Sequence, residues 1–96
     1  MTTVYADNAA TTRMSRAAIG AMLPYMETIY GNPSSLHSVG QQAAAALLSA
    51  RERIAGCLNA APREIYFTSG GSEADNQALL SAARLGERAG KKHILS

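Results

Sequence analysis

The chain has 96 residues, a formal net charge of +2 and an apolar content of 47%. A domain of this length buries roughly 60–65% of its unfolded surface, so a core of its own is marginal. The basic residues are scattered, and most lie near an acidic residue, which excludes the basic stripe typical of nucleic-acid-binding proteins. The single cysteine, Cys57, excludes an internal disulfide and a zinc site built from cysteines of this chain.

We expect a cytoplasmic protein that does not contact membranes. The first residues lack the basic flank and the apolar run of a signal peptide. The longest apolar run, Ala43–Leu48, is far shorter than a membrane span. A chain with one cysteine also fits a reducing compartment.

The first elements that we predict are a short strand, a loop and a helix. Val4–Ala6 is a short apolar run that favours a strand, and the small polar residues Asp7–Arg13 favour a loop. Ser15 is a suitable N-cap for a helix from Arg16 to about Leu23. Pro24 is expected to end or kink this helix, because its ring clashes with the preceding turn, and Tyr25–Tyr30 is expected to resume it.

A long amphipathic helix is predicted from about Leu36 to Ala60, after the loop formers Gly31–Ser35. Apolar residues recur at spacings of three and four and form one stripe: Val39, Ala43, Leu47, Ala50, Ile54 and Leu58. Ala61-Pro62 closes the helix, because a residue before proline avoids the helical region. Because alanine supplies helix propensity but little burial energy, the stripe needs a partner surface.

The last third of the chain predicts a βαβ unit and hence an α/β fold with a parallel pair of strands. Glu64–Thr68 is rich in β-branched and aromatic residues and favours a strand. A helix from Ser72 to about Glu87 follows the tight turn Ser69–Gly71. A second strand begins at His93–Ser96, where the chain stops, and its unpaired edge indicates an incomplete domain.

The segment Thr68–Glu73 is the strongest candidate for chemistry. Two glycines and several hydroxyls lie between a strand and a helix, where free N–H groups and the helix dipole favour an anion. The segment does not match the dinucleotide fingerprint or the P-loop, so a nucleotide site is disfavoured. The alternative is purely structural, because Ser72 with Asp75 also fits a capping box.

The other polar segments favour structural roles. Asp7–Thr12 and Gly31–His37 are interpreted as turn-forming loops, with a pocket mouth as the alternative, and Ser34 or Ser35 as a cap for the long helix. His37 and His93 lack an obvious carboxylate partner, so we expect both to be structural. Cys57 lies beside the apolar stripe and is expected to be a buried, inert thiol. Tyr66 and Phe67, as neighbours in a strand, are expected to face opposite sides of a sheet.

Together these segments resemble the start of the cysteine desulfurases, within the class V aminotransferase group. Tyr5–Thr12 resembles the family's opening, and Tyr30–Gly40 resembles its second signature. Ala50–Glu52 followed by Glu64–Asn76 resembles its third. Three motifs in register, over nearly the whole chain, are a specific match.

The resemblance implies the N-terminal part of a type I pyridoxal-phosphate-dependent transferase fold, with its βαβ unit cut in the second strand. Residues 1–60 are then an N-terminal arm with helices, and residues 61–96 begin the large cofactor-binding domain. The family consists of homodimers that take sulfur from L-cysteine, leave alanine and hold the sulfur as an enzyme persulfide. A sulfur-acceptor or scaffold protein then receives it for iron-sulfur cluster assembly or another sulfur-transfer pathway.

The resemblance also assigns the site residues. The positions of Gly71 and Ser72 bind the phosphate of pyridoxal 5'-phosphate in the family, with Ser72 in place of a more usual threonine. No catalytic residue and no metal ligand is assigned to this chain. The family's cofactor-binding lysine and its persulfide cysteine lie beyond the position of Ser96, and neither Lys91, Lys92 nor Cys57 matches them. We therefore expect residues 1–96 alone to be inactive.

Two alternatives to a cysteine desulfurase remain open at this point. One is a related class V member, either a selenocysteine lyase or an aminotransferase. The other is a small α/β module that binds a phosphorylated ligand or a partner protein without catalysis. A non-catalytic module and the start of an enzyme differ in whether the reading frame continues after Ser96.

Overall fold

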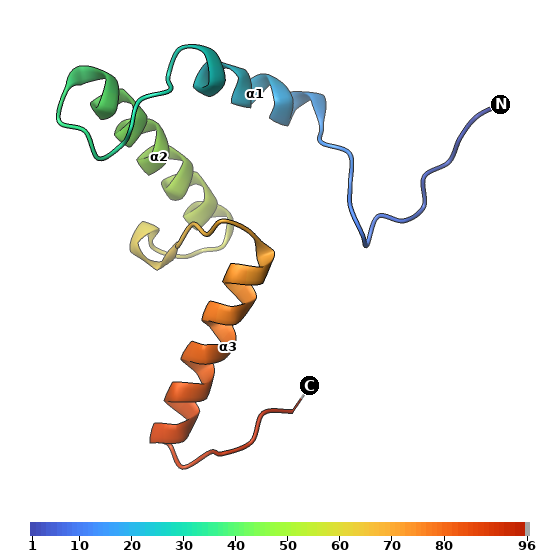
Figure 1. The fold of residues 1–96 in the computed structure, drawn as a ribbon, viewed down its shortest axis with the longest axis vertical. Helices are drawn as coiled ribbons and strands as arrows, with labels where there is room; N and C mark the ends of the chain where they lie inside the picture. Colours follow the sequence, from blue (N-terminus) through green and yellow to red (C-terminus); the bar gives the residue numbers. More distant parts are fainter. Residues whose placement is uncertain (96) are drawn as a thin grey trace. The chain divides into compact units, whose positions relative to one another are not determined.

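The computed structural model describes residues 1–95, and this part of the chain is helical (Figure 1). It contains the helices α1 (Arg16–Glu27), α2 (Ser38–Cys57) and α3 (Gly71–Arg88), with the short 3-10 helix η1 (Pro62–Glu64) between the last two. The backbone contacts divide the chain into two units, Met1–Ile54 and Ala55–Ser96. Each unit is described below by itself.

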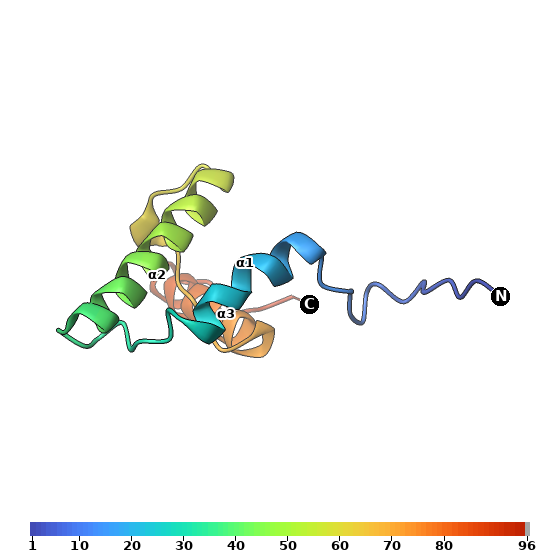
Figure 2. The same ribbon diagram turned by 90° about the horizontal axis from the view of Figure 1, so that it is seen from above.

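The N-terminal arm before α1 has no helix and no strand (Figures 1 and 2). The predicted strand Val4–Ala6 is therefore wrong, whereas the loop that follows it is confirmed. A turn forms at residues 8–10, where the N–H of Ala10 donates to the carbonyl of Asp7 at 3.2 Å. The Tyr5 hydroxyl donates to the same carbonyl at 2.9 Å and also lies 3.2 Å from the carbonyl of Thr11. This hydroxyl fastens the two ends of the turn.

Helix α1 begins as the sequence predicts. Ser15 is its N-cap, and the Ser15 hydroxyl accepts from the N–H of Ala18 at 3.1 Å. Of the two outcomes expected at Pro24, an end of the helix is wrong, since the helix continues through Pro24 to Glu27, within the segment expected to resume it. Proline has no N–H to donate to the ladder, but its carbonyl still accepts from the N–H of Thr28 at 2.9 Å and from the Thr28 hydroxyl at 3.0 Å.

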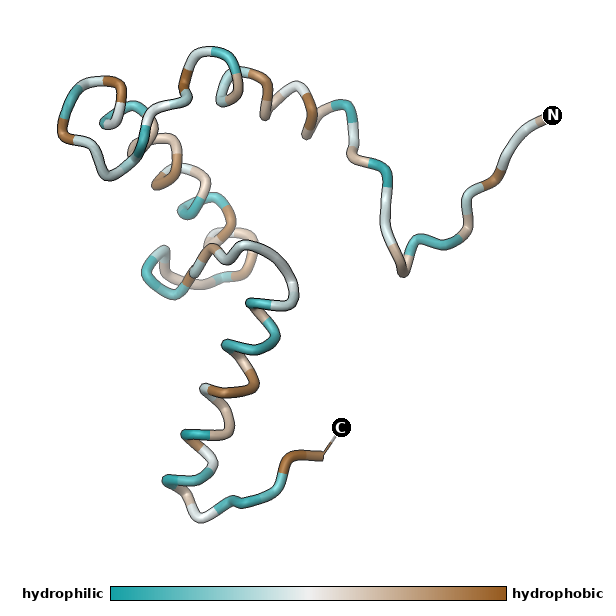
Figure 3. The backbone as a smooth tube through the Cα atoms, viewed as in Figure 1, coloured by the Kyte–Doolittle hydropathy of each residue, from teal (hydrophilic) through white to brown (hydrophobic). Residues whose placement is uncertain are grey.

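Helix α2 confirms the predicted long helix, although it is shorter at each end. Its apolar stripe stays partly open to solvent, with Val39 at 38%, Leu47 at 40% and Ile54 at 40% exposed. Among the described residues the only buried apolar side chains are Ala43 and Ala55. Apolar and polar residues alternate along the helices (Figure 3). Among the described residues no large side chain is fully buried. The thin core expected from an alanine-rich chain is confirmed.

The end of α2 is a Schellman motif. Asn59 has a φ of 52°, the left-handed conformation that this motif places just past a helix. The N–H of Ala60 donates to the carbonyl of Ala55 at 2.9 Å, and the N–H of Asn59 donates to that of Gly56 at 3.4 Å. These two bonds satisfy carbonyls that the last helical turn leaves free. The helix therefore ends at Cys57, four residues before the predicted closing pair Ala61-Pro62.

The predicted strand Glu64–Thr68 does not form. Pro62–Glu64 closes a 3-10 turn instead, in which the Glu64 carboxylate accepts from the N–H of Ala61 at 2.7 Å. Ile65 is extended, with φ −98° and ψ 123°, but no strand of the described chain pairs with this segment. Extended backbone needs a neighbour for its hydrogen bonds, so local β propensity alone makes no strand.

The βαβ unit is consequently not seen among residues 1–95. Residues 93–95 of the predicted second strand have no regular structure, and Ser96 lies outside the described residues. Without a sheet, Tyr66 and Phe67 do not face opposite sides of one; they are 73% and 45% exposed. The helix of the unit is confirmed as α3, and it is followed by the predicted loop, in which Gly90 adopts a φ of 76°.

Candidate functional site

The N-terminus of α3 lies where the sequence predicts a phosphate site. Gly70 is the N-cap, and Gly71 and Ser72 are the first two helical residues. The first backbone N–H to join the helical ladder is that of Ala74, which donates to the carbonyl of Gly70 at 3.2 Å. The N–H groups of Gly71 and Ser72 precede it and have no carbonyl to bond within the helix. These free N–H groups form the positive end of the helix dipole, where an anion is favoured.

The capping box expected from Ser72 and Asp75 is wrong. Ser72 lies inside the helix and not at the N-cap, and its backbone carbonyl accepts from the Asn76 amide at 2.8 Å. The carboxylate that bonds at this turn belongs to Glu73, whose Oε2 accepts from the N–H of Ser69, the residue before the N-cap, at 2.7 Å and from the Ser69 hydroxyl at 2.6 Å. Sequence reasoning missed Glu73, although a glutamate three residues after a small N-cap residue is the usual position for a carboxylate that reaches back.

These hydrogen bonds also settle the charge of Glu73. The Ser69 hydroxyl, and then the Ser69 N–H, lower the pKa of the Glu73 carboxyl below its ordinary value. Glu73 is therefore ionised at neutral pH and lies next to the positive end of α3, which stabilises it. Its charge disfavours a second anion nearby, but its bonds occupy the donors of Ser69 and leave those of Gly71 and Ser72.

The glycines leave open space at this end of the helix. A Cβ atom built on Gly70 or on Gly71 would meet nothing within 4 Å. The carbonyl of Gly70 accepts both from the N–H of Ala74 at 3.2 Å and from the Thr68 hydroxyl at 3.0 Å. Two backbone N–H groups and one hydroxyl thus form an accessible set of neutral donors. This donor set suits a phosphate group.

The second predicted motif, Gly31–His37, packs tightly onto the start of α2. A Cβ on Gly40 would lie 2.5 Å from the carbonyl oxygen of Ser35 and 2.7 Å from that of Asn32. His37 caps the helix, since its Nδ1 accepts from the N–H of Gly40 at 3.3 Å. The structural role expected for His37 is confirmed, and capping by Ser34 or Ser35 is wrong. The N–H groups of both serines donate to Asn32 instead, at 2.9 Å each.

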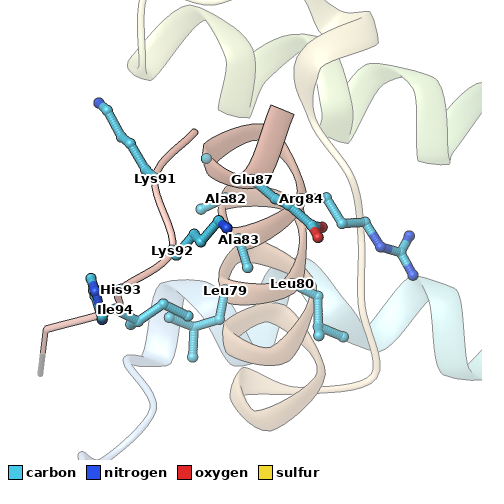
Figure 4. A pocket seen from close by; sticks show the side chains of 11 residues that line it. Leu79, Leu80, Ala82, Ala83, Arg84, Glu87, Lys91, Lys92, His93 and Ile94 are labelled. Carbon is cyan, nitrogen blue, oxygen red and sulfur yellow. The ribbon is translucent and has the colours of Figure 1, made fainter. Parts of the chain in front are cut away.

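The remaining predicted residues do not join the α3 site. Cys57 is exposed at the last turn of α2, so the expected buried thiol is wrong for the described chain. His93 borders a hollow of about 700 Å³ between α3 and the segment after it. Lys91, Lys92 and the apolar residues Leu79 and Leu80 also line this hollow (Figure 4). The residues described hold no group of three potential metal ligands.

A membrane span is also not found in the part of the chain that the structure describes, since no helix there combines the necessary length and apolar character.

The family follows from comparison with known proteins. Residues 4–96 match the model of the class-V aminotransferases, so the chain belongs to this family. The predicted class V assignment is confirmed, and with it the type I pyridoxal-phosphate fold that the family implies.

The relatives are more specific than the family. The chain is 45% identical over 93 residues to the cysteine desulfurase IscS of Methanosarcina thermophila, covering 97% of this chain and 23% of that protein. It is 43% identical over 96 residues to a cysteine desulfurase of Trichormus azollae, covering 100% of this chain and 24% of the relative. A cysteine desulfurase of Cereibacter sphaeroides is 51% identical over 83 residues. The chain spans about a quarter of the length of these relatives. No solved structure matches it.

Proposed function

We propose that this chain is the N-terminal part of a cysteine desulfurase. The observation that carries the proposal is the identity of 43–51% to proteins of that name over most or all of the chain. The complete enzyme takes sulfur from L-cysteine, leaves alanine and passes the sulfur, held as a persulfide, to an acceptor or scaffold protein. It works as a homodimer in the cytoplasm, and iron-sulfur cluster assembly is one use of the sulfur.

We also propose that Gly71 and Ser72 hold the phosphate of pyridoxal 5'-phosphate. The two N–H groups and the Ser72 hydroxyl are the donors, and the absence of a side chain on Gly71 lets the anion approach the backbone. When bound, this cofactor supplies an electron sink for the chemistry at the amino acid. The contribution of this chain is to bind and orient the phosphate, because the covalent lysine and the persulfide cysteine of the family lie outside it.

The third part of the proposal concerns the fold of the whole enzyme. Residues 61–96 begin the large cofactor-binding domain, and residues 1–60 form an arm with helices before it. Segments 64–68 and 93–96 become parallel strands once the neighbouring strands of that domain are present. Support comes from their exposed apolar side chains, with Tyr66 at 73%, Ile94 at 66% and Leu95 at 96%. A sheet covered by helices would bury them.

The activity is tested with the full-length protein loaded with cofactor. We expect L-cysteine to yield alanine and, with a thiol reductant, sulfide in equal amounts. Preference for L-selenocysteine by orders of magnitude would indicate a selenocysteine lyase, and amino-group transfer without sulfide an aminotransferase. No turnover of any amino acid would contradict the proposal and favour a binding module.

The site is tested by retention of the cofactor in full-length variants. A hydrogen bond to a charged group is worth roughly 1.5–3 kcal/mol, so Ser72→Ala is expected to weaken cofactor binding about ten- to a hundredfold. Gly71→Val is expected to weaken it more. A Cβ at position 71 meets nothing in the chain itself, so this variant should keep the fold. Unchanged retention in both variants would show that the assignment is wrong.

A further inference from the structure

The Ser69–Gly71 turn is held by one oxygen atom. Glu73 Oε2 accepts both from the N–H of Ser69 at 2.7 Å and from its hydroxyl at 2.6 Å. The bonds reach back four residues, across the turn that leads into α3. Charged acceptors form the stronger class of hydrogen bond, and these two are short. The position of Ser69 relative to the helix start is therefore fixed by Glu73.

The same bonds divide the donors of this segment into two groups. Ser69 has an N–H and a hydroxyl that could both bond an anion, but Glu73 uses both. The donors of Gly71 and Ser72 stay available at the helix entrance. Thr68 stabilises the turn from the other side through its bond to the carbonyl of Gly70.

We propose that Glu73 is a positioning residue for the cofactor phosphate: by binding Ser69 it fixes the turn and directs the anion to Gly71 and Ser72. The inference rests on the proposed function, because it concerns the same phosphate. Glu73 does not touch the phosphate. Glu73 orders the backbone of the turn before the phosphate binds, so the entropy lost in ordering the turn does not weaken the binding.

The negative charge of Glu73 repels the phosphate, whereas its hydrogen bonds order the turn that binds it. One substitution separates the effect of the charge from the effect of the bonds. Since both bonds end on a single oxygen, the amide oxygen of Glu73→Gln can accept both and keep the turn, while the charge is removed. Glu73→Ala removes the charge and the bonds together. If the bonds matter, the glutamine variant retains affinity for phosphate or gains some, and the alanine variant loses it.

The experiment measures the dissociation constant of pyridoxal 5'-phosphate for the full-length apoprotein, with inorganic phosphate as a competing probe. Freeing the backbone of one residue corresponds to about a tenfold change, so Glu73→Ala is expected to bind both probes at least about tenfold more weakly. Glu73→Gln should bind them at least as tightly as the parent. Ser69→Ala, which keeps the backbone bond, should fall between the parent and Glu73→Ala.

The outcomes separate this inference from the site assignment. If Ser72→Ala weakens binding and Glu73→Ala does not, the role of Glu73 is wrong and the phosphate site stands. Equal weakening in Glu73→Ala and Glu73→Gln also overturns it, because charge and not the bonds would then matter. If Ser72→Ala has no effect, the site itself is wrong and the inference falls with it. Loss of thermal stability in the alanine variant without a change in either dissociation constant would show that Glu73 is only a helix cap.

Discussion

Replacement of Gly40 by alanine tests the packing of the Gly31–His37 motif onto α2. The added Cβ would lie 2.5 Å from the carbonyl oxygen of Ser35, 2.6 Å from the Ser35 Cβ and 2.7 Å from the carbonyl oxygen of Asn32, whereas ordinary contact begins at 3.4 Å. Two of these atoms are backbone carbonyl oxygens, which cannot turn aside as a flexible side chain can. The loop must therefore move away from the helix.

Two effects of opposite sign set the magnitude. Overpacking costs typically 1–3 kcal/mol, and the clash with backbone places Gly40→Ala near about 3 kcal/mol. Alanine within a helix gains about 1 kcal/mol over glycine. The net expectation is a loss of about 2 kcal/mol in the stability of this local unit. That loss corresponds to roughly thirtyfold faster local opening.

Amide hydrogen exchange in the full-length protein is the assay. We expect faster exchange for the amides of Ser35 and Gln41, which donate to carbonyls in this motif at 2.9 and 3.0 Å. Gly56→Ala is the matched control in the same helix, because a Cβ there meets nothing within 4 Å. It should gain up to about 1 kcal/mol from helix propensity. Equal or slower exchange in Gly40→Ala would refute the close packing of the loop on α2.

Four other expectations follow from the same structure. Ser15→Ala should cost about 1 kcal/mol in the stability of α1, measured by hydrogen exchange at Ala18, and no loss would contradict its capping role. Residues 1–96 alone should release no sulfide from L-cysteine above the level of free cofactor; turnover would refute the placing of the catalytic groups outside this chain. The exposed stripe of α2 should make the isolated chain self-associate or stay partly disordered, and a compact monomer that unfolds cooperatively, seen by sedimentation and thermal melting, would argue against this. Hydrogen bonds from Ser69 lower the pKa of the Glu73 carboxyl in the folded state. The stability that they contribute is therefore complete above the ordinary glutamate pKa of about 4.3 and is lost as the pH falls through the lower pKa of the folded state. Protection of the Ser69 amide from hydrogen exchange should decline in acid, and Glu73→Gln should abolish that decline.

The helices and their N-terminal boundaries could be predicted from the sequence because their determinants are local. Ser15 before an apolar helical pattern gave the start of α1, and the stripe through Ala43 and Leu47 gave α2. Pro24 was misjudged because a proline in a helix removes one hydrogen bond without forcing the chain to stop. The serine caps were misjudged as well, since the choice between Ser34, Ser35 and His37 depends on how the loop folds back on Gly40.

The absence of the predicted strands from residues 1–95 could not be foreseen, because a strand forms only beside a partner strand, which local sequence does not specify. Glu64–Thr68 has the composition of a strand, yet the described residues contain no other strand beside which it could form a sheet. The same dependence on distant partners applies to Cys57 and the stripe of α2, which the described residues leave exposed. At the candidate site the sequence placed Gly71 and Ser72 at the start of a helix, which α3 confirms, but it assigned the cap to Ser72, whereas the N-cap is Gly70.

Our central proposal is that the N-terminus of α3 binds the phosphate of pyridoxal 5'-phosphate. A crystal structure of the full-length protein with pyridoxal 5'-phosphate tests it most directly. We predict phosphate oxygens about 2.7–3.2 Å from the backbone nitrogens of Gly71 and Ser72 and about 2.5–3.0 Å from the Ser72 hydroxyl. A phosphate bound elsewhere, with Ser72 facing only solvent or its own helix, would contradict it.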